Sequence, residues 1–368
     1  MRSGVPSGRG LLAGLLAAAL FLAAWAVSRS SPPIVAFAQS GETEDPFLWF
    51  PVVFNQVSGI PEICFSEERP LLSIQGDQAA AFRSRSSPLP ARAGVEARTA
   101  RWQHVSAYPV IVEGGPDVCF SGGTVIGSYP DSVDWETMHD TTAFTFRSRG
   151  RTTVENLRAH NYGDGISFSR GTPADSFHIR RVYLSHMRDD CIQNDYMYSG
   201  VIDDSLLDGC YTAISAQSAG ASEGLDGSQN LVTVKNSLIR LEPMQQVYQN
   251  RGLIPGHGSF FKWNRDDDHS PRLALHNNIF RADQPANNTG GLGIPEGKLA
   301  SCSNNIMVWL GEGPFPDPLP LMHNGRTCFT ITTDPAVWEQ AVLDWLVRHP
   351  QTASQAPRPQ MKTSQPEP

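Results

Sequence analysis

Two short acidic phrases in the middle of the chain hold the residues best suited to chemistry. Asp164 lies in the phrase Asn-Tyr-Gly-Asp-Gly-Ile, and the adjacent pair Asp189 and Asp190 belongs to a second phrase further along the chain. If the two phrases lie on neighbouring strands, about 4.8 Å apart, the three carboxylates share one patch. Like charges at that spacing raise at least one pKa, which leaves a protonated acid beside an ionised base. Cleavage of a glycosidic bond requires such a pair.

Two other interpretations of these aspartates stay open. Asp-Gly and Asp-Asp are common in turns, because the carboxylate accepts hydrogen bonds from nearby backbone amides. Stacked carboxylates also suit calcium, and the acidic run at 266–268 followed by His269 is a second calcium candidate. Apart from possible calcium we expect no cofactor.

Four further residues are candidates for catalysis or substrate binding. His257 lies between two glycines, which let the backbone approach a ligand closely, so we predict a catalytic role for it. Lys262 follows two aromatic residues and could bind a sugar or a carboxylate. Arg188 precedes the acidic pair, and Tyr211 could stack on a sugar ring. The ordinary alternatives are a loop tip for His257, a solvated strand face for Lys262 and packing for Tyr211.

A repeated phrase predicts the elements that would hold these side chains. It has an apolar residue, a polar residue two positions later and an apolar residue five positions after the first. The polar positions of its six copies are Asn156, Arg181, Asp204, Asn236, Asn277 and Asn304. The short interval between the early copies, the β-branched residues and the frequent Gly, Asn and Asp favour stacked strands over helix pairs. We therefore predict an all-β fold, a single-stranded right-handed parallel β-helix, with side-chain amides stacked at one turn. A β-sandwich is the alternative.

The spacing of the acidic phrases agrees with this repeat. The interval from Asp164 to Asp189 is the same as the interval from Asn156 to Arg181, the first two polar positions. One coil of the predicted β-helix would therefore separate the two phrases, and strand stacking would place them side by side.

The region from Gly122 to Ile214 resembles the polygalacturonase-type glycoside hydrolases of the pectin-lyase-like β-helix superfamily. The resemblance is carried by Gly-Gly-Thr-Val-Ile-Gly from Gly122, by the two acidic phrases, and by Ala-Ile-Ser around Ile214. The family has N-T-D-G, D-D-C, G-H-G and R-I-K in chain order. The resemblance implies that Asp164 corresponds to the first motif and Asp189 and Asp190 to the second. It also implies that all three catalyse an inverting hydrolysis.

The chain departs from the family pattern in three places. Tyr162-Gly163 replaces the Thr of the first motif, and the third coil around Asp208 has no His. The phrase Gly256-His257-Gly258 lies much further beyond Asp190 than the next coil, where the family has it, and of the last motif only Lys262 remains.

The first 38 residues predict export. They have a basic start, an apolar run from Leu11 to Val27 and an Ala-Phe-Ala cleavage signal at Ala36. An uncleaved N-terminal anchor is the alternative; after cleavage no stable membrane insertion is expected. We expect a secreted, cell-surface or periplasmic protein.

Six cysteines in an exported chain predict disulfide bonds. Cys64 and Cys119 lie in similar phrases, and Cys302 with Cys328 could close the C-terminal end, although the sequence leaves fifteen pairings open. The formal net charge of −8, without a basic stripe, argues against nucleic acid as a partner. A polysaccharide substrate is the expected partner.

The C-terminal region predicts one helix. Asp334-Pro335 has the form of a helix start, and an apolar face follows as far as Arg348. We interpret this helix as a lid on the open end of the coil; a partner-binding helix is the alternative. The predicted segments are an export signal at 1–38, a tether and N-terminal cover at 39–105, the β-helix at 106–333, the capping helix at 334–349 and a disordered tail at 350–368.

Together these observations predict an exported enzyme that hydrolyses glycosidic bonds of an acidic or plant-type glycan. Asp190 or Asp189 would be the general acid, Asp164 and the remaining aspartate would activate water, and Lys262 with His257 would position the substrate. Two alternatives are a polysaccharide lyase or epimerase that uses calcium or a cationic base, and a non-catalytic surface or adhesive β-helix.

Overall fold

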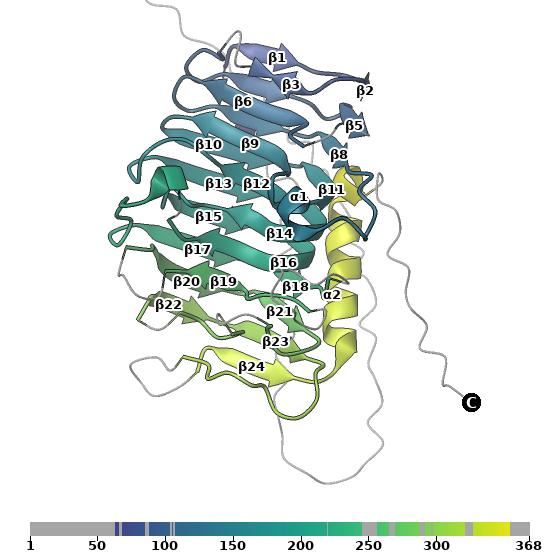
Figure 1. Ribbon diagram of the computed structural model, residues 1–368, viewed down its shortest axis with the longest axis vertical. Helices are drawn as coiled ribbons and strands as arrows, with labels where there is room; N and C mark the ends of the chain where they lie inside the picture. Colours follow the sequence, from purple (N-terminus) through teal and green to yellow (C-terminus); the bar gives the residue numbers. More distant parts are fainter. Residues whose placement is uncertain are drawn as a thin grey trace, which may run out of the picture. The chain divides into compact units, whose positions relative to one another are not determined.

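The computed structural model is built mostly of parallel β-strands (Figure 1). It describes residues 63–65, 68–84, 88–103, 105, 107–218, 220–244, 256–264, 269–287, 291–295, 297–320 and 327–353. The predicted export signal, the acidic run at 266–268 and nearly all of the tail that we predicted to be disordered lie outside these residues. The first residues of that tail form the short helix α3 (Pro350–Ala353) instead. None of the helices in the described ranges is long and apolar enough to cross a bilayer.

One sheet contains nine strands in a regular order. They are β1 (Leu71–Ser73), β4 (Gly94–Glu96), β7 (Cys119–Ser121), β10 (Arg151–Glu155), β13 (Ser176–Arg180), β15 (Ser199–Asp203), β17 (Leu231–Lys235), β20 (Arg272–His276) and β22 (Leu299–Ser303). Each strand pairs in parallel with the next, so the chain returns to this sheet one strand further along after each excursion.

The second sheet has a main line of ten strands. They are β2 (Asp77–Gln78), β5 (Arg101–Gln103), β8 (Thr124–Ile126), β11 (Arg158–Tyr162), β14 (Tyr183–Gln193), β16 (Leu206–Ala216), β18 (Leu238–Leu241), β21 (Ile279–Ala282), β23 (Asn305–Trp309) and β24 (Phe329–Thr332). A branch line of β3 (Phe82–Arg83), β6 (Val110–Gly114), β9 (Thr142–Ser148) and β12 (Asp164–Phe168) joins the C-terminal half of β14. The same line continues through the C-terminal half of β16 to β19 (Phe261–Trp263).

The repeated phrase forms the turn between the two sheets. All six of its polar positions have positive φ, between 45° and 60°, a conformation that Asn and Asp tolerate better than most residues. The predicted amide ladder is present in the later copies: Asn304 donates to Asn277, and Asn277 donates to Asn236, each over 3.2 Å.

A second, fully buried ladder lies one residue after the predicted one. Asn305 accepts from both the backbone N and the side-chain amide of Asn278, and Asn278 in turn accepts from the backbone N of Ser237. The Ser237 hydroxyl accepts from the backbone N of Ser205. These four side chains are buried, whereas Asn277 is half-buried and Asn304 is exposed. The buried polar ladder is therefore offset by one residue from the predicted one.

The sheets begin earlier than we predicted. β1 to β5 pair in parallel with later strands, so these five strands belong to the sheets rather than to a separate cover. These strands contain only two or three residues each, which is too short for an alternating pattern to appear in the sequence.

All six cysteines are paired. The bonds join Cys64 to Cys119, Cys191 to Cys210 and Cys302 to Cys328. The first and third are the pairings that the sequence suggested, and the second links neighbouring strands β14 and β16.

Helix α2 (Pro335–Arg348) begins as predicted but packs in a different place. Asp334 caps it by accepting a hydrogen bond from the Ala336 backbone N over 2.9 Å. Its apolar face contacts the outer face of the second sheet, not the last strand edge (Figure 1). The residues of this contact are Trp338, Ala341, Val342 and Trp345 on the helix, and Tyr183, Leu206, Leu238, Ile279 and Val308 on the sheet. The prediction of a lid over the end of the coil was wrong, because this column of outward-facing apolar side chains offers a larger surface to bury.

Candidate functional site

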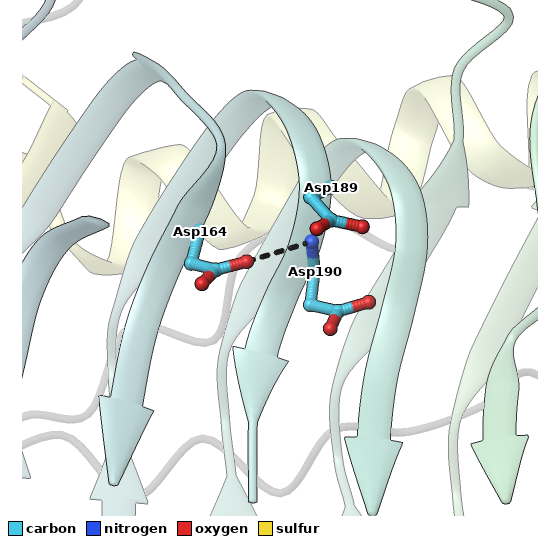
Figure 2. Close-up of side chains that lie close together, drawn as sticks. All are labelled: Asp164, Asp189 and Asp190. Carbon is cyan, nitrogen blue, oxygen red and sulfur yellow. Dashed lines mark hydrogen bonds between the residues drawn. The ribbon is translucent and has the colours of Figure 1, made fainter. Parts of the chain in front are cut away.

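The structure brings the three predicted carboxylates together. At least one oxygen of each of Asp164, Asp189 and Asp190 lies within 4.8 Å of the others (Figure 2). The residues are 2%, 1% and 0% exposed. The backbone N of Asp190 donates to Asp164 Oδ1 over 3.1 Å, and Thr142 Oγ1 donates to Asp164 Oδ2 over 3.2 Å.

Strand register explains why the carboxylates meet. Asp164 opens β12 and pairs with Thr142 of β9, while Asp190 of β14 pairs with Thr212 of β16. The pairing of β14 with β16 shifts between Met187 and Asp190. The backbone N of Asp189 donates to the Gly163 carbonyl over 2.9 Å, which fixes the acidic pair beside β12.

A disulfide bond anchors the acidic pair from the other side. Cys191 follows Asp190 directly, and its bond to Cys210 ties β14 to β16 at this point. The backbone on both sides of the carboxylates is therefore held in place.

Lys262 supplies one positive charge to the site. Its Nζ lies 3.4 Å from Asp190 Oδ2, although the two residues are 72 positions apart. Burial acts to lower the pKa of Lys262, but the charges of Asp190, Asp189 and Asp195 outweigh it and raise that pKa. Lys262 therefore stays protonated, and its side chain is 31% exposed.

A second basic side chain, His139, contacts the carboxylates and was not predicted. It ends the short helix α1 (Trp135–His139), and its Nδ1 lies 2.6 Å from Asp189 Oδ2. The hydrogen bond to Asp189 raises the pKa of His139 against the opposing effect of burial. The indole of Trp135 stacks on the imidazole with 4.4 Å between ring centroids.

Gly163 explains how α1 reaches the carboxylates. A Cβ at this position would lie 1.9 Å from the Met138 carbonyl oxygen and 2.8 Å from that of Thr141. Only glycine lets the end of α1 lie this close to the residue before Asp164. The Thr141 hydroxyl accepts from the Gly163 backbone N over 2.8 Å, and the Thr141 carbonyl accepts from Asp164 N over 2.9 Å.

Burial and crowding shift the proton affinities of the carboxylates. Burial raises the pKa of Asp190 to about 7 despite the opposing charge of Lys262. Burial, then the charges of Asp189 and Asp190, raise the pKa of Asp164 well above its usual range. The Asp190 Oδ1 atom is buried and has no hydrogen-bond partner within the described part of the chain.

Arg188 lies next to the site but does not face it. Its guanidinium donates to Asn161 Oδ1 and to the Tyr129 and Pro130 carbonyls over 2.7 to 3.1 Å. It holds the 127–133 segment in place, so the structure gives it a structural position instead of the predicted substrate-binding one.

Tyr211 and His257 are also packed inside the protein. Tyr211 is 5% exposed, donates to Asn287 Oδ1 over 2.9 Å and packs with Met244 and Trp135. His257 is fully buried, with Nδ1 3.0 Å from the Gly258 carbonyl, and burial lowers its pKa. The charge that acts on the pKa of His257 is that of Asp283, not that of the three carboxylates. Neither contact places these residues on the carboxylates.

The donor set fits a calcium ion poorly. Calcium binds six to eight oxygen ligands, whereas two of the three carboxylates already contact Lys262 and His139. These two cations offset the carboxylate charge that a divalent ion would neutralise. No step below depends on a metal.

Comparison of the chain with family models, curated proteins and solved structures found no match. The function of the site is therefore inferred from its geometry.

Proposed function

We propose that this protein is an exported enzyme that hydrolyses glycosidic bonds in a polysaccharide. One observation carries the proposal: a buried carboxylate with a raised pKa and a free oxygen, Asp190, lies within 4.8 Å of two further carboxylates. A protonated acid and an ionised base side by side are what general acid–base cleavage of an acetal requires.

We also propose that the strands wind as a single-stranded right-handed parallel β-helix. Support comes from the three lines of parallel strands that the chain visits in turn, and from the recurrent left-handed turn at each polar position. In such a coil the site would lie on the line formed by β12, β14, β16 and β19.

The geometry supports a distinct role for each residue. Asp190 is the general acid, because burial raises its pKa to about 7 and its buried Oδ1 has no hydrogen-bond partner among the described residues. Asp189 is the base that activates water, since His139 stabilises its ionised form. Asp164 accepts a hydrogen bond from the Asp190 backbone and so orients the acid. Lys262 is the exposed cation that would contact an anionic substrate group.

The lyase alternative receives less support from the site. A lyase needs a base that removes a proton next to a carboxyl group, and the neighbouring carboxylates keep Lys262 charged. Arg188 is engaged with the 127–133 segment. Neither cation is placed to act as that base.

The proposed hydrolysis can proceed with inversion or with retention at the anomeric carbon, and the two courses can be distinguished by measurement. The family resemblance implies inversion, for which the two carboxyl groups are typically about 6.5–9.5 Å apart, whereas retaining enzymes have about 5 Å. The oxygens here lie within 4.8 Å, closer to the retaining spacing. Proton NMR of the first product from a cleaved oligosaccharide identifies its anomer and so decides between the two courses.

The function is tested with a panel of neutral and uronate-containing polysaccharides. Reducing ends and unsaturated, ultraviolet-absorbing products are measured in parallel. We expect reducing ends without ultraviolet absorbance, and we expect Asp190→Asn to lower turnover at least about a hundredfold.

Asp203→Asn is the matched control, because Asp203 pairs with Lys235 over 3.3 Å on the other sheet. It should leave turnover unchanged. Ultraviolet-absorbing products would establish the lyase instead. An Asp190→Asn variant that is destabilised and keeps full turnover would identify the cluster as structural.

A further inference from the structure

His139 is the most exposed member of the cluster around the carboxylates. Its side chain is 43% exposed, whereas that of Asp189, which it contacts at 2.6 Å, is 1% exposed. The contact crosses 50 positions of sequence and depends on α1 lying against Gly163. The fold therefore positions His139 and Asp189 against each other.

Each of the two basic side chains contacts a different carboxylate. Lys262 contacts Asp190, and His139 contacts Asp189. Asp164 accepts hydrogen bonds only from Thr142 and the Asp190 backbone among its described contacts. Three buried carboxylates this close together cannot all be ionised at low cost, so burial and the contacts of each one together influence where the negative charge resides. Burial outweighs Lys262 at Asp190 and raises its pKa, whereas Asp189 has the short contact with His139.

We propose that His139 is a positioning residue that keeps Asp189 ionised, so that Asp189 rather than Asp190 or Asp164 serves as the base. The inference rests on the proposed hydrolysis. It deepens that proposal by assigning the base and the residue that controls it. In the reaction, Asp190 gives its proton to the leaving oxygen while Asp189 takes one from the attacking water, so the cluster ends with the same number of protons.

The charges that face the imidazole come from two elements. They are Asp189 and Asp190 on β14 and Lys262 on β19, while α1 itself carries Glu136 in its first turn. Lys262 opposes protonation of His139, while Asp189 and Asp190 favour it. The pairing with Asp189 is the largest of these effects, so the imidazolium and the carboxylate stabilise each other's charged form.

The test replaces His139 in two ways. His139→Asn keeps a donor near the position of Nδ1 but cannot carry charge, and His139→Phe keeps an aromatic ring against Trp135 without a donor. In both variants we expect the acidic limb of the plot of kcat/KM against pH to move to higher pH, by about 1 pH unit or more. Because that limb then approaches the deprotonation of Asp190, maximal kcat/KM should fall about tenfold or more.

His276→Asn is the matched control. His276 is a half-buried histidine of the other sheet, with Nδ1 2.9 Å from the Ser303 hydroxyl. Its replacement should leave the pH profile in place. Profiles of both His139 variants that superimpose on the wild-type profile would overturn the proposal.

A second measurement does not depend on activity. Imidazole ¹H and ¹³C chemical shifts of histidine-labelled protein, followed against pH, report the titration of His139 directly. We expect this titration to move to lower pH in Asp189→Asn, because the hydrogen bond to Asp189 raises the pKa of His139. If no glycan is cleaved but the His139 titration moves, the proposed function fails while the pairing stands. An unmoved titration contradicts the pairing itself.

Gly163→Ala tests the same contact from the other side. The added Cβ would displace the end of α1, because it would overlap the Met138 carbonyl. Provided that the melting temperature shows a folded protein, this variant should reproduce the lowered His139 titration of Asp189→Asn. A folded Gly163→Ala protein with the wild-type titration would contradict a role for α1.

Discussion

Asp164 accepts hydrogen bonds from a hydroxyl and a backbone amide but, within the described residues, contacts no cation. Its pKa is raised by burial and by its two acidic neighbours. A raised folded-state pKa means that the native state binds the proton more tightly than the unfolded chain does. This stabilisation is therefore greatest below the unfolded pKa of about 3.9 and is lost as pH rises towards the folded pKa.

We predict that Asp164→Asn stabilises the protein at pH 8 but not at pH 4. The Asn amide can still accept from the Asp190 backbone and cannot ionise, so the cost of an ionised, buried carboxylate disappears at high pH. Differential scanning calorimetry of both proteins at the two pH values checks this. A melting-temperature difference that is the same at both pH values would show that Asp164 does not titrate between them.

The acidic cluster was predictable from sequence, but its cations were not all predictable. The interval between Asp164 and Asp189 matches one passage through both sheets, so the spacing alone places them side by side. His139 lies in the segment between β8 and β9, where no repeat gives its position. The local signal was Gly163, which has no side chain and so leaves room for α1.

At the scale of the element, two polar ladders share the later turns between the sheets. Asn277 is half-buried with φ of 56°, while its neighbour Asn278 is fully buried. Asn278 accepts from the Ser237 backbone N and donates to the Val234 carbonyl and to Asn305. Its loss would leave buried groups without partners.

We predict that Asn278→Ala costs about 2–3 kcal/mol of unfolding free energy, because unsatisfied buried groups carry the full penalty. Asn277→Ala should cost about 1–2 kcal/mol, largely because alanine disfavours positive φ. Asn277→Gly should cost less than Asn277→Ala, since glycine has no such preference. Urea denaturation of the three variants measures the order. An Asn277→Ala variant that loses as much stability as Asn278→Ala would contradict the conclusion that the buried ladder stabilises the turn more than the predicted one.

The helix α2 was predictable from local sequence, whereas the surface on which it packs was not. Asp334 and the apolar spacing up to Arg348 are local, so the helix itself was predictable. Its binding surface combines Tyr183, Leu206, Leu238 and Ile279, which come from four separate strands. No short stretch of sequence contains that column, so the place where α2 packs could not be inferred.

At the scale of the whole molecule, each strand pairs only with its neighbours along the stack. Stability in such an array is approximately a sum of local terms and nearest-neighbour contacts. Two disulfide bonds lie towards the ends of the stack: Cys64–Cys119 includes β7, and Cys302–Cys328 joins β22 to the residue before β24. Each bond should therefore protect its own end.

We predict that replacing both Cys302 and Cys328 with Ser increases backbone hydrogen exchange in β22, β23 and β24 and leaves β4 and β7 unchanged. The effect should extend through α2 as far as β14, because Trp345 donates to the Asp204 carbonyl over 3.0 Å and its ring contacts Tyr183. Replacing Cys64 and Cys119 is the mirror control, and it should raise exchange in β4 and β7 alone. Exchange resolved by peptide mass spectrometry separates the two patterns. Equal increases along the whole stack in either variant would mean that the protein opens as one cooperative unit, and that coupling between the strands is not local.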